Sequence, residues 1–422
     1  SQSTFFGPAK YAILPQHLEP EELVGGNALV ETGTFVAILA GTIGAGLIMQ
    51  YDNYLIITAC SVLVFSSLGY LCSKKIPLAA ANQSQLKISL NPVKTTYELI
   101  IKARENRPVY LATIAISWFW FLGAAYLTQF PNFAKEVLGG DSSLVTLLLA
   151  VFTVGIAIGS MLCERLSSSH VELGIVPIGA LGLTIFGIDL YCTIPAFPEQ
   201  VLTWQQFLNQ AGGFRLLIDL TGIGVFGGIF IVPLYAFVQE RSDPEFRART
   251  IAVINIMNAL FMVMSAITAM LFLGMMDQII PDFFLIISII NLIVCICIFS
   301  RVDEFSIRFI VWMLSHTLYR VKHKNLHSIP RQGAAVLVCN HVSYVDALII
   351  AGASPRPIRF VMDHEIFSNR FFAWFFKSVK AIPIAAAHKN RSVYDQAFDS
   401  ISEALNNQEL VCIFPEGKLT HR

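Results

Sequence analysis

The segment NHVSYVD, residues 340–346, places His341 and Asp346 five positions apart. In a continuous helix that separation turns the two side chains about 140° away from each other, so they meet only if a turn lies between them. A carboxylate beside an imidazole fixes its tautomer and stabilises its charged form, and the imidazole can then take a proton from a hydroxyl group. The segment therefore predicts His341 as a general base oriented by Asp346. Ser343 is too close in sequence to His341 to be a persuasive nucleophile.

The residues on both sides of this segment predict alternating strands and helices. We expect strands at 334–340, 357–362, 381–384 and 409–417, and helices at 345–353, 371–380 and 391–407. This alternation is typical of a mostly parallel sheet covered by helices. His341 follows the first strand, and the sequence FPEG ends the last one. We therefore expect a partial α/β domain at residues 330–422, with its chemistry at the ends of two strands.

Residues 1–301 have the composition of an α-helical polytopic membrane domain. Over the whole chain, 55% of residues are hydrophobic and 14% are charged, against roughly 25% charged in an average soluble chain. An apolar run of about 20 residues can cross a bilayer as a helix. Eight such runs lie at 28–49, 54–73, 110–130, 144–163, 173–194, 216–238, 250–275 and 279–300. Residues 5–14 read as the end of one more helix, which gives eight spans and a stub.

Basic residues in the loops fix the orientation, because Lys and Arg favour the cytoplasmic side of a membrane. If the stub ends in the cytoplasm, thirteen Lys and Arg lie on the cytoplasmic side, Lys10 among them, and two, Lys135 and Arg215, lie on the other. Everything after residue 301 is then cytoplasmic. The long basic loop at 74–108 precedes six spans, which is typical of one complete half of a six-plus-six transporter. On this interpretation the stub is a fourth helix, and we expect three helices upstream.

Polar side chains within the apolar runs are candidates for transport, because they are costly in hydrocarbon. Asn27 and Glu31 lie on one helical face at i and i+4, with Glu31 one turn into its span. Asn255 and Asn258 share a face at i and i+3. For Glu31 we weigh a role in transport or gating equally against a structural role. For the two later asparagines, hydrogen bonding between helices is the leading alternative.

Other residues in the spans suggest how the helices pack. Arg215 and Asp219, at i and i+4, are predicted to form a local ion pair near the outer end of their helix. The G-x-x-x-G sequences at 155–159 and 224–228 would let two backbones approach closely. The alternative is that glycine is simply frequent in membrane helices.

Residues 302–329 join two parts of opposite net charge. Residues 1–301 carry 15 Lys and Arg against 19 Asp and Glu, whereas residues 302–422 carry 14 against 10. Within the joint, 303–324 combines Phe and Trp with Arg and Lys, which is typical of an amphipathic helix in the interface of an anionic leaflet. The alternative is a soluble helix packed on the next domain. Nucleic-acid binding is disfavoured, because the excess positive charge is small and adjoins a membrane.

Several sequences in the first 300 residues are similar to those of a known family. FGPAKYAILPQHL at 6–18 and PEELVGGNALVETGTFVAILAGT at 20–42 resemble the fourth and fifth helices of bacterial lysophospholipid transporters of the major facilitator superfamily. VPLYAFVQER at 232–241 and TIAVINIMNALFM at 250–262 resemble their tenth and eleventh helices. SMLCERLSS at 160–168 resembles a degenerate copy of the G-x-x-x-D-R-x-G loop signature. The resemblance implies a partial major facilitator fold, from the end of helix 4 to helix 12.

Residues from about 325 to 422 resemble the glycerolipid acyltransferase family of the lysophosphatidate acyltransferase type. NHVSYVD matches its first motif, and the resemblance implies that His341 is the catalytic base and that Asp346 orients it. The matching FPEG motif implies acceptor binding through its four residues and the lysine after them. The substrate-binding residues that we expect are Asn340, Ser343, Phe414, Pro415, Glu416, Gly417 and Lys418.

The sequence departs from this family at two places. The family continues F-P-E-G-T-R, whereas this chain continues Lys418-Leu419-Thr420, and its middle motif ends in a phosphate-binding Arg where this chain has Ala385 and Ala386. Lys418, Lys389 or Arg391 could supply the missing charge. These departures fit a lysophospholipid with a head group on its phosphate better than a lysophosphatidate.

The two resemblances together imply a bifunctional protein of the bacterial inner membrane. One half would move lysophospholipid inward, and the cytoplasmic half would reacylate it with an acyl group from acyl-carrier protein or acyl-CoA. No metal or nucleotide motif is visible, so we expect no metal and no cofactor in this fragment. ATP would serve only an acyl-activating ligase domain, which we expect after residue 422. The alternatives are a lysophosphatidate acyltransferase anchored by its membrane domain, and a transporter of another solute with an inactive acyltransferase domain.

Overall fold

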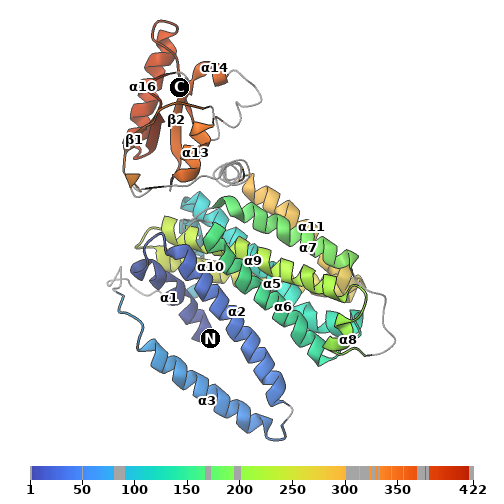
Figure 1. Ribbon diagram of the computed structural model, residues 1–422. Helices are drawn as coiled ribbons and strands as arrows, with labels where there is room; N and C mark the ends of the chain where they lie inside the picture. The colour runs from blue at the N-terminus through green and yellow to red at the C-terminus, as the bar shows by residue number, and fades with distance from the viewer. Residues whose placement is uncertain are drawn as a thin grey trace. The chain divides into compact units, whose positions relative to one another are not determined.

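The protein forms two compact units in the computed structural model (Figure 1). One consists of residues 1–171 and 175–298, and the other of residues 172–174 and 299–422. The residues that the structure describes are 2–49, 51–79, 91–166, 173–193, 201–300, 313, 324, 328–330, 333–343, 345–354, 356–367, 376 and 380–417. Most of the predicted amphipathic joint at 302–329 lies outside the described residues, and so does most of the helix predicted at 371–380.

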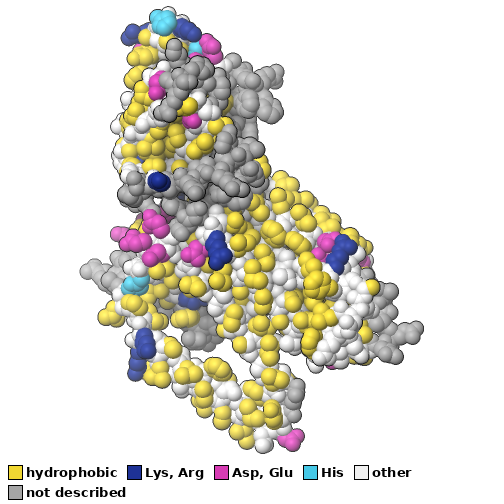
Figure 2. All heavy atoms as spheres, viewed as in Figure 1, with side chains coloured by type: hydrophobic (Ala, Val, Ile, Leu, Met, Phe, Trp, Pro, Cys, Tyr) yellow, Lys and Arg dark blue, Asp and Glu magenta, His cyan; other side chains and the backbone are white. Residues whose placement is uncertain are grey.

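The first unit is helical, and eight of its described helices are long and apolar enough to cross a membrane. All eight predicted spans are confirmed in this sense, and the stub is a helix as well. The helices are α1 (Gln2–His17), α2 (Leu23–Ile48), α3 (Tyr54–Ser73), α4 (Pro92–Glu105), α5 (Arg107–Asn132), α6 (Ser142–Leu166), α7 (Val176–Cys192), α8 (Trp204–Leu208), α9 (Gly213–Arg241), α10 (Arg247–Ala269) and α11 (Ile280–Phe299). Hydrophobic side chains cover most of the face of this unit in Figure 2, as expected of a surface that meets lipid.

The helix α4 lies within the stretch that the sequence analysis treats as a loop, at 74–108. Its start follows standard helix chemistry, because the Asn91 side chain accepts a hydrogen bond from Lys94 N at 3.0 Å and Pro92 takes the first position. The helix α3 has no buried residue, and Figure 1 shows it apart from the bundle formed by α5, α6, α7 and α9. Most of its apolar surface is therefore open to lipid or to another helix.

Glycines bring α6 and α9 together, as the two G-x-x-x-G sequences predict. A Cβ atom built on Gly228 would lie 2.5 Å from the backbone nitrogen of Ser160, and one built on Gly159 would overlap the carbonyl of Val225. Gly155 and Gly224 face each other's backbones in the same way. The absence of side chains at these positions is therefore what allows the two helices to touch, and the prediction of close packing is confirmed.

The second unit contains a four-stranded parallel sheet in the order β1-β4-β2-β3. Its strands are β1 (Ala335–Val338), β2 (Ile358–Asp363), β3 (Ile382–Ile384) and β4 (Leu410–Ile413), and its helices include α13 (Asp346–Ala353), α14 (His364–Phe367) and α16 (Arg391–Asn406). The four strands and the helices at 345–353 and 391–407 were predicted, and α14 was not. A buried cluster of Ile358, Phe360, Leu410 and Cys412 holds the central strands together.

Parallel pairing places the carboxyl ends of all four strands at one edge of the sheet. In the registers, Val338 lies beside Ile413, and Asp363 lies beside Ile384. Crossover connections between parallel strands need helices on the faces of the sheet, which α13 and α16 supply after β1 and β3. The segment after β1 and the segment after β4 therefore meet at this edge, because these two strands are neighbours.

Candidate functional site

His341 and Asp346 meet at the carboxyl end of β1. The strand's last ladder bond runs from Cys339 N to the carbonyl of Ile413, at 3.1 Å, and the chain then turns into α13. Across this turn the imidazole Nδ1 lies 3.2 Å from Asp346 Oδ2. The turn that the sequence analysis requires is therefore present, and it brings the two side chains into hydrogen-bond contact. About a fifth of each side chain is exposed, so the pair is accessible to a substrate.

The same carboxylate oxygen also organises the backbone of the turn. Asp346 Oδ2 accepts hydrogen bonds from Val342 N at 2.7 Å and from Ser343 N at 2.8 Å. Burial disfavours the charged carboxylate, but these two backbone donors and the His341 ring outweigh burial and hold the pKa of Asp346 below its ordinary value. The carboxylate is therefore ionised at neutral pH and available to stabilise a charged imidazole.

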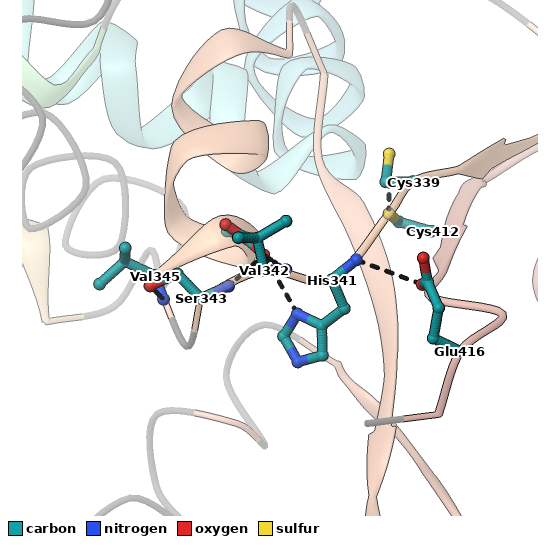
Figure 3. A network of polar contacts seen from close by, with 8 residues as sticks. Cys339, His341, Val342, Ser343, Val345, Cys412 and Glu416 are labelled. Carbon is teal, nitrogen blue, oxygen red and sulfur yellow. Dashed lines mark hydrogen bonds and ion pairs between the residues drawn. The ribbon is translucent and has the colours of Figure 1, made fainter. Parts of the chain in front are cut away.

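The segment after β4 forms the other side of the site, as Figure 3 shows. The Phe414 ring stacks on the His341 imidazole with centroids 4.5 Å apart. The Glu416 carboxylate accepts a hydrogen bond from the backbone N–H of His341 at 3.2 Å. Gly417 has a positive φ of 62°, a conformation that glycine adopts without strain, and its N–H bonds to the carbonyl of Phe414 at 3.1 Å. Two of the predicted substrate-binding residues therefore also position the histidine.

The remaining predicted substrate-binding residues surround this pair. Asn340, Pro415 and Gly417 are exposed, and Lys418 lies outside the described residues. Ser343 takes part in the turn: its carbonyl accepts from Asp346 N at 3.1 Å, and its hydroxyl accepts from Val345 N at 3.4 Å. Their contacts with a substrate stay a prediction.

A second histidine–aspartate contact lies at the end of β2, and the sequence analysis missed it. His364 Nδ1 lies 3.1 Å from Asp363 Oδ1. These residues are adjacent in sequence and more exposed, with 32% of the His364 side chain and 53% of the Asp363 side chain accessible. Of the basic residues suggested for the missing phosphate-binding charge, Lys389 pairs with Glu365 and Arg391 pairs with Asp395. The contact at the end of β1 is less exposed, and its carboxylate also accepts two backbone hydrogen bonds, so it is the better candidate for catalysis.

In the membrane unit, Asn27 and Glu31 belong to a buried polar cluster that joins three helices. Both side chains are fully buried, and Glu31 lies more than two turns into α2, which begins at Leu23 and not at the predicted residue 28. Glu31 accepts a hydrogen bond from the Tyr11 hydroxyl of α1 at 2.5 Å. Asn27 and Gln239 of α9 exchange hydrogen bonds at 2.7 and 3.0 Å. The two transport candidates therefore differ in their hydrogen bonding. The Asn27 amide is hydrogen-bonded to Gln239, whereas Glu31 Oε2 has no hydrogen-bond partner.

Lys10 lies within α1 and not in the loop where the sequence analysis places it. Its ammonium donates a hydrogen bond to Thr34 Oγ1 at 3.2 Å. The helix continues to His17, so Pro15, in its last turn, does not end it. Twelve Lys and Arg then remain on the side predicted to be cytoplasmic, against two on the other, so the predicted orientation keeps its basis.

The two asparagines of α10 contact different helices. Asn258 hydrogen-bonds the Ser117 hydroxyl of α5 at 2.9 Å, which is the structural alternative that the sequence left open. Asn255 lies against α1, where a Cβ atom built on Gly7 would be 2.9 Å from its Nδ2 atom. Asn258 therefore links α10 to α5 by a hydrogen bond, Asn255 lies against α1, and a role of either in transport stays a prediction.

The predicted ion pair between Arg215 and Asp219 is wrong. Arg215 forms its ion pair with Asp189 of α7, on the neighbouring helix. Asp219 is buried and accepts a hydrogen bond from the Thr193 hydroxyl at 3.0 Å. The partner across the helices is favoured because Asp189 and Arg215 can both stay partly in water, whereas Asp219 faces the interior of the bundle.

The degenerate loop signature brings Glu164, near the end of α6, to the first turn of α2. A Cβ atom built on Gly25 would lie 2.7 Å from Glu164 Oε1. A carboxylate at the amino-terminal end of a helix interacts favourably with the unpaired N–H groups there. Glu164 therefore places a carboxylate at this helix end, from the position where the signature G-x-x-x-D-R-x-G has its aspartate.

Comparison with known proteins agrees with this division of the chain. Residues 3–266 match the family model of the Major Facilitator Superfamily, and residues 320–422 match the Acyltransferase family model. Among curated proteins, the lysophospholipid transporter LplT of Pectobacterium carotovorum is 30% identical over 257 residues, which cover 60% of this chain and 58% of that protein. The transporters of the same name from Citrobacter koseri and Photorhabdus laumondii are each 27% identical, over 60% and 56% of this chain and 59% and 54% of their own length. The chain therefore spans less than two thirds of these relatives.

Proposed function

Because the chain belongs to the Major Facilitator Superfamily and also carries an acyltransferase domain, we propose that it moves lysophospholipids across the bacterial inner membrane and reacylates them. The transport half of the proposal is supported by the similarity to lysophospholipid transporters over 60% of the chain. The acyl-transfer half rests on one observation, the contact between His341 Nδ1 and Asp346 Oδ2 at 3.2 Å at the end of a strand.

The proposed chemistry needs only a base, the carboxylate that orients it and an activated acyl donor. Since Nδ1 faces Asp346, Nε2 is the nitrogen that takes the proton from a glycerol hydroxyl of the lysophospholipid. The hydroxyl oxygen attacks the thioester carbonyl of acyl-carrier protein or acyl-CoA, so a C–O bond forms and the C–S bond breaks. The departing thiolate receives the proton from the imidazolium. Asp346 stabilises the imidazolium between these two proton transfers.

The sidedness of the reaction is part of the proposal. The asymmetry of Lys and Arg between the loops favours a cytoplasmic acyltransferase domain. A cytoplasmic site has access to acyl-carrier protein or acyl-CoA, and a lysophospholipid that has crossed the membrane would reach the same leaflet. Transport and acylation would then be consecutive steps on one lipid.

The acyl-transfer proposal is tested by assaying full-length protein in membranes with lysophosphatidylethanolamine and lysophosphatidate as acceptors. We expect His341→Ala to lower the acylation rate about 10²- to 10⁴-fold, as removal of a general base does. Ser343→Ala is the matched control, because it removes the hydroxyl that the sequence analysis weighs as a nucleophile, and we expect it to stay within about tenfold of wild type.

The outcomes separate the proposal from its two alternatives. Acylation that survives His341→Ala would mean that this domain is not the acyltransferase. A clear preference for lysophosphatidate would support an enzyme that makes phosphatidate and uses its membrane unit as an anchor. Failure of reconstituted protein to take up any lysophospholipid would point to another transported solute.

A further inference from the structure

The acyltransferase domain contains two cysteines, and they face each other across neighbouring strands. Cys339 directly follows β1 and Cys412 lies in β4, with their Sγ atoms 3.9 Å apart. Cys412 is fully buried in the core cluster of the sheet, and the half-buried Cys339 packs against it. The sulfur atoms of a disulfide are about 2.05 Å apart, so these two need to approach each other by only about 1.9 Å to form one.

The two cysteines are connected through the backbone to both sides of the catalytic site, as Figure 3 shows. Cys339 lies two residues before His341, on the chain that leaves β1. Cys412 lies two residues before Phe414, whose ring stacks on the His341 imidazole with centroids 4.5 Å apart. Glu416, further along the same segment, accepts the hydrogen bond from the backbone N–H of His341. A bond that draws the two sulfur atoms together therefore pulls on the strand ends that hold the histidine and the residues packed against it.

The two thiols differ in access and in acidity. Cys339 is partly exposed, so a small hydroperoxide can reach it, whereas Cys412 is enclosed by the core. Burial, together with the neighbouring Cys339 sulfur, raises the pKa of Cys412 to about 12, so this thiol stays protonated at neutral pH. Cys339 is therefore the thiol that reacts first with an oxidant, and Cys412 is the thiol that resolves the product.

The oxidation balances in two steps. The Cys339 sulfur attacks one oxygen of the hydroperoxide, so that an S–O bond forms, the O–O bond breaks and the departing oxygen takes the thiol proton. The Cys412 sulfur then attacks the Cys339 sulfur, so that the S–S bond forms, the S–O bond breaks and the hydroxide leaves as water with the Cys412 proton. The two thiols together give two electrons to the peroxide, and a dithiol reverses the reaction by exchange.

We propose that Cys339 and Cys412 are a redox modification site, at which a hydroperoxide forms a disulfide that slows acyl transfer at His341. The effect on the rate rests on the proposed acyltransferase function, whereas formation of the disulfide does not. Disulfides in cytosolic proteins are usually transient, and either catalytic or redox-sensing. A pair of thiols two residues from a catalytic histidine and from the ring that stacks on it fits the second of these roles.

The test compares acylation of lysophosphatidylethanolamine by full-length protein in membranes before and after hydrogen peroxide, and again after dithiothreitol. We expect peroxide to lower the wild-type rate about tenfold or more, because a displacement of about 1 Å in a reacting group can cost about 10²-fold, and dithiothreitol to restore it. Peptides joined through Cys339 and Cys412, detected by mass spectrometry after free thiols are blocked, are the second readout.

Two variants show whether this pair of thiols is responsible. Cys339→Ser should keep the untreated wild-type rate both before and after peroxide, to within about threefold, as a substitution outside the catalytic contacts does. Cys72→Ser is the matched control: it removes an exposed thiol from α3, and it should remain as sensitive to peroxide as wild type.

The results distinguish failure of this site from failure of the proposed function. If peroxide inhibits Cys339→Ser as strongly as wild type, or if inhibited wild type yields no joined peptide, the modification site is overturned and acyl transfer stands. A joined peptide with an unchanged acylation rate would overturn the control of catalysis by the disulfide. If reduced wild type acylates no lysophospholipid, the proposed acyl transfer fails and its redox control fails with it, while the joined peptide still reports on the thiols.

Discussion

Substituting Asp346 by asparagine separates the two tasks of this carboxylate. Oδ2 accepts two backbone hydrogen bonds, from Val342 and Ser343, and contacts His341 Nδ1. An amide oxygen in the same position can still accept all three bonds, so the turn should persist. The negative charge beside the imidazole is lost. Asp346→Asn should therefore affect catalysis far more than folding.

The size of the effect follows from the distance between the charges. Two unit charges 3.2 Å apart interact by about 5 kcal/mol at an effective dielectric constant near 20, and by about half of that if solvent doubles the constant. Since a fifth of each side chain is exposed, we take the range from about 2.5 to 5 kcal/mol, which corresponds to a loss of roughly 10²- to 10⁴-fold in the acylation rate.

The assay is the initial rate of acyl transfer to lysophosphatidylethanolamine by full-length protein, with the thermal unfolding midpoint measured in parallel. Asp363→Asn is the matched control, because Asp363 contacts a histidine in the same way at the end of β2. We expect this control to stay within about threefold of wild type, as for a surface charge. If Asp346→Asn retains more than a tenth of the wild-type rate, or if the two variants lose the same amount, stabilisation of the imidazolium by Asp346 is refuted.

Three further predictions concern stability and positioning. The pKa of Asp346 is lowered in the folded protein. The contribution of this carboxylate to stability is therefore complete above the ordinary aspartate pKa of about 3.9 and is lost as the pH falls through the lowered value. The difference in unfolding midpoint between wild type and Asp346→Asn should be constant from neutral pH to about pH 5 and should shrink below about pH 4. Phe414→Leu removes the ring stacked on His341 and should lower the acylation rate by about three- to tenfold, since such stacking contributes roughly 0.5–1.5 kcal/mol, with Phe414→Tyr restoring it. Gly228→Val places methyl groups against the Ser160 backbone and should destabilise the membrane unit by about 1–3 kcal/mol, measured as a lower unfolding midpoint. Gly274→Val is the control, because Gly274 has open space around it, and it should have little effect.

The strands and the catalytic turn could be predicted because their signals are local. Each strand is a short apolar run bounded by polar residues, and the five-residue spacing of His341 and Asp346 needs only a turn between them. The order β1-β4-β2-β3 could not be read from these runs, since it depends on which strands pair. The same limit explains Arg215: spacing along one helix favoured Asp219, whereas the nearer partner in space belongs to α7. Tyr11 escaped notice because its contact with Glu31 joins two helices whose facing sides the sequence does not specify.

Asp346 and Glu31 differ in how completely the hydrogen bonds of their carboxylates are made. Asp346 Oδ2 receives three donors from its own turn, so it holds groups in place and makes no direct demand on a substrate. Glu31 has one donor on one oxygen and none on the other, in surroundings where an unmade hydrogen bond is expensive. Changes at Asp346 should therefore slow acylation of every acceptor alike, whereas changes at Glu31 should alter lipid uptake and leave acylation of a supplied acceptor unchanged. If substitutions at Asp346 and at Glu31 changed the same property, the separate roles that these contacts indicate would be refuted.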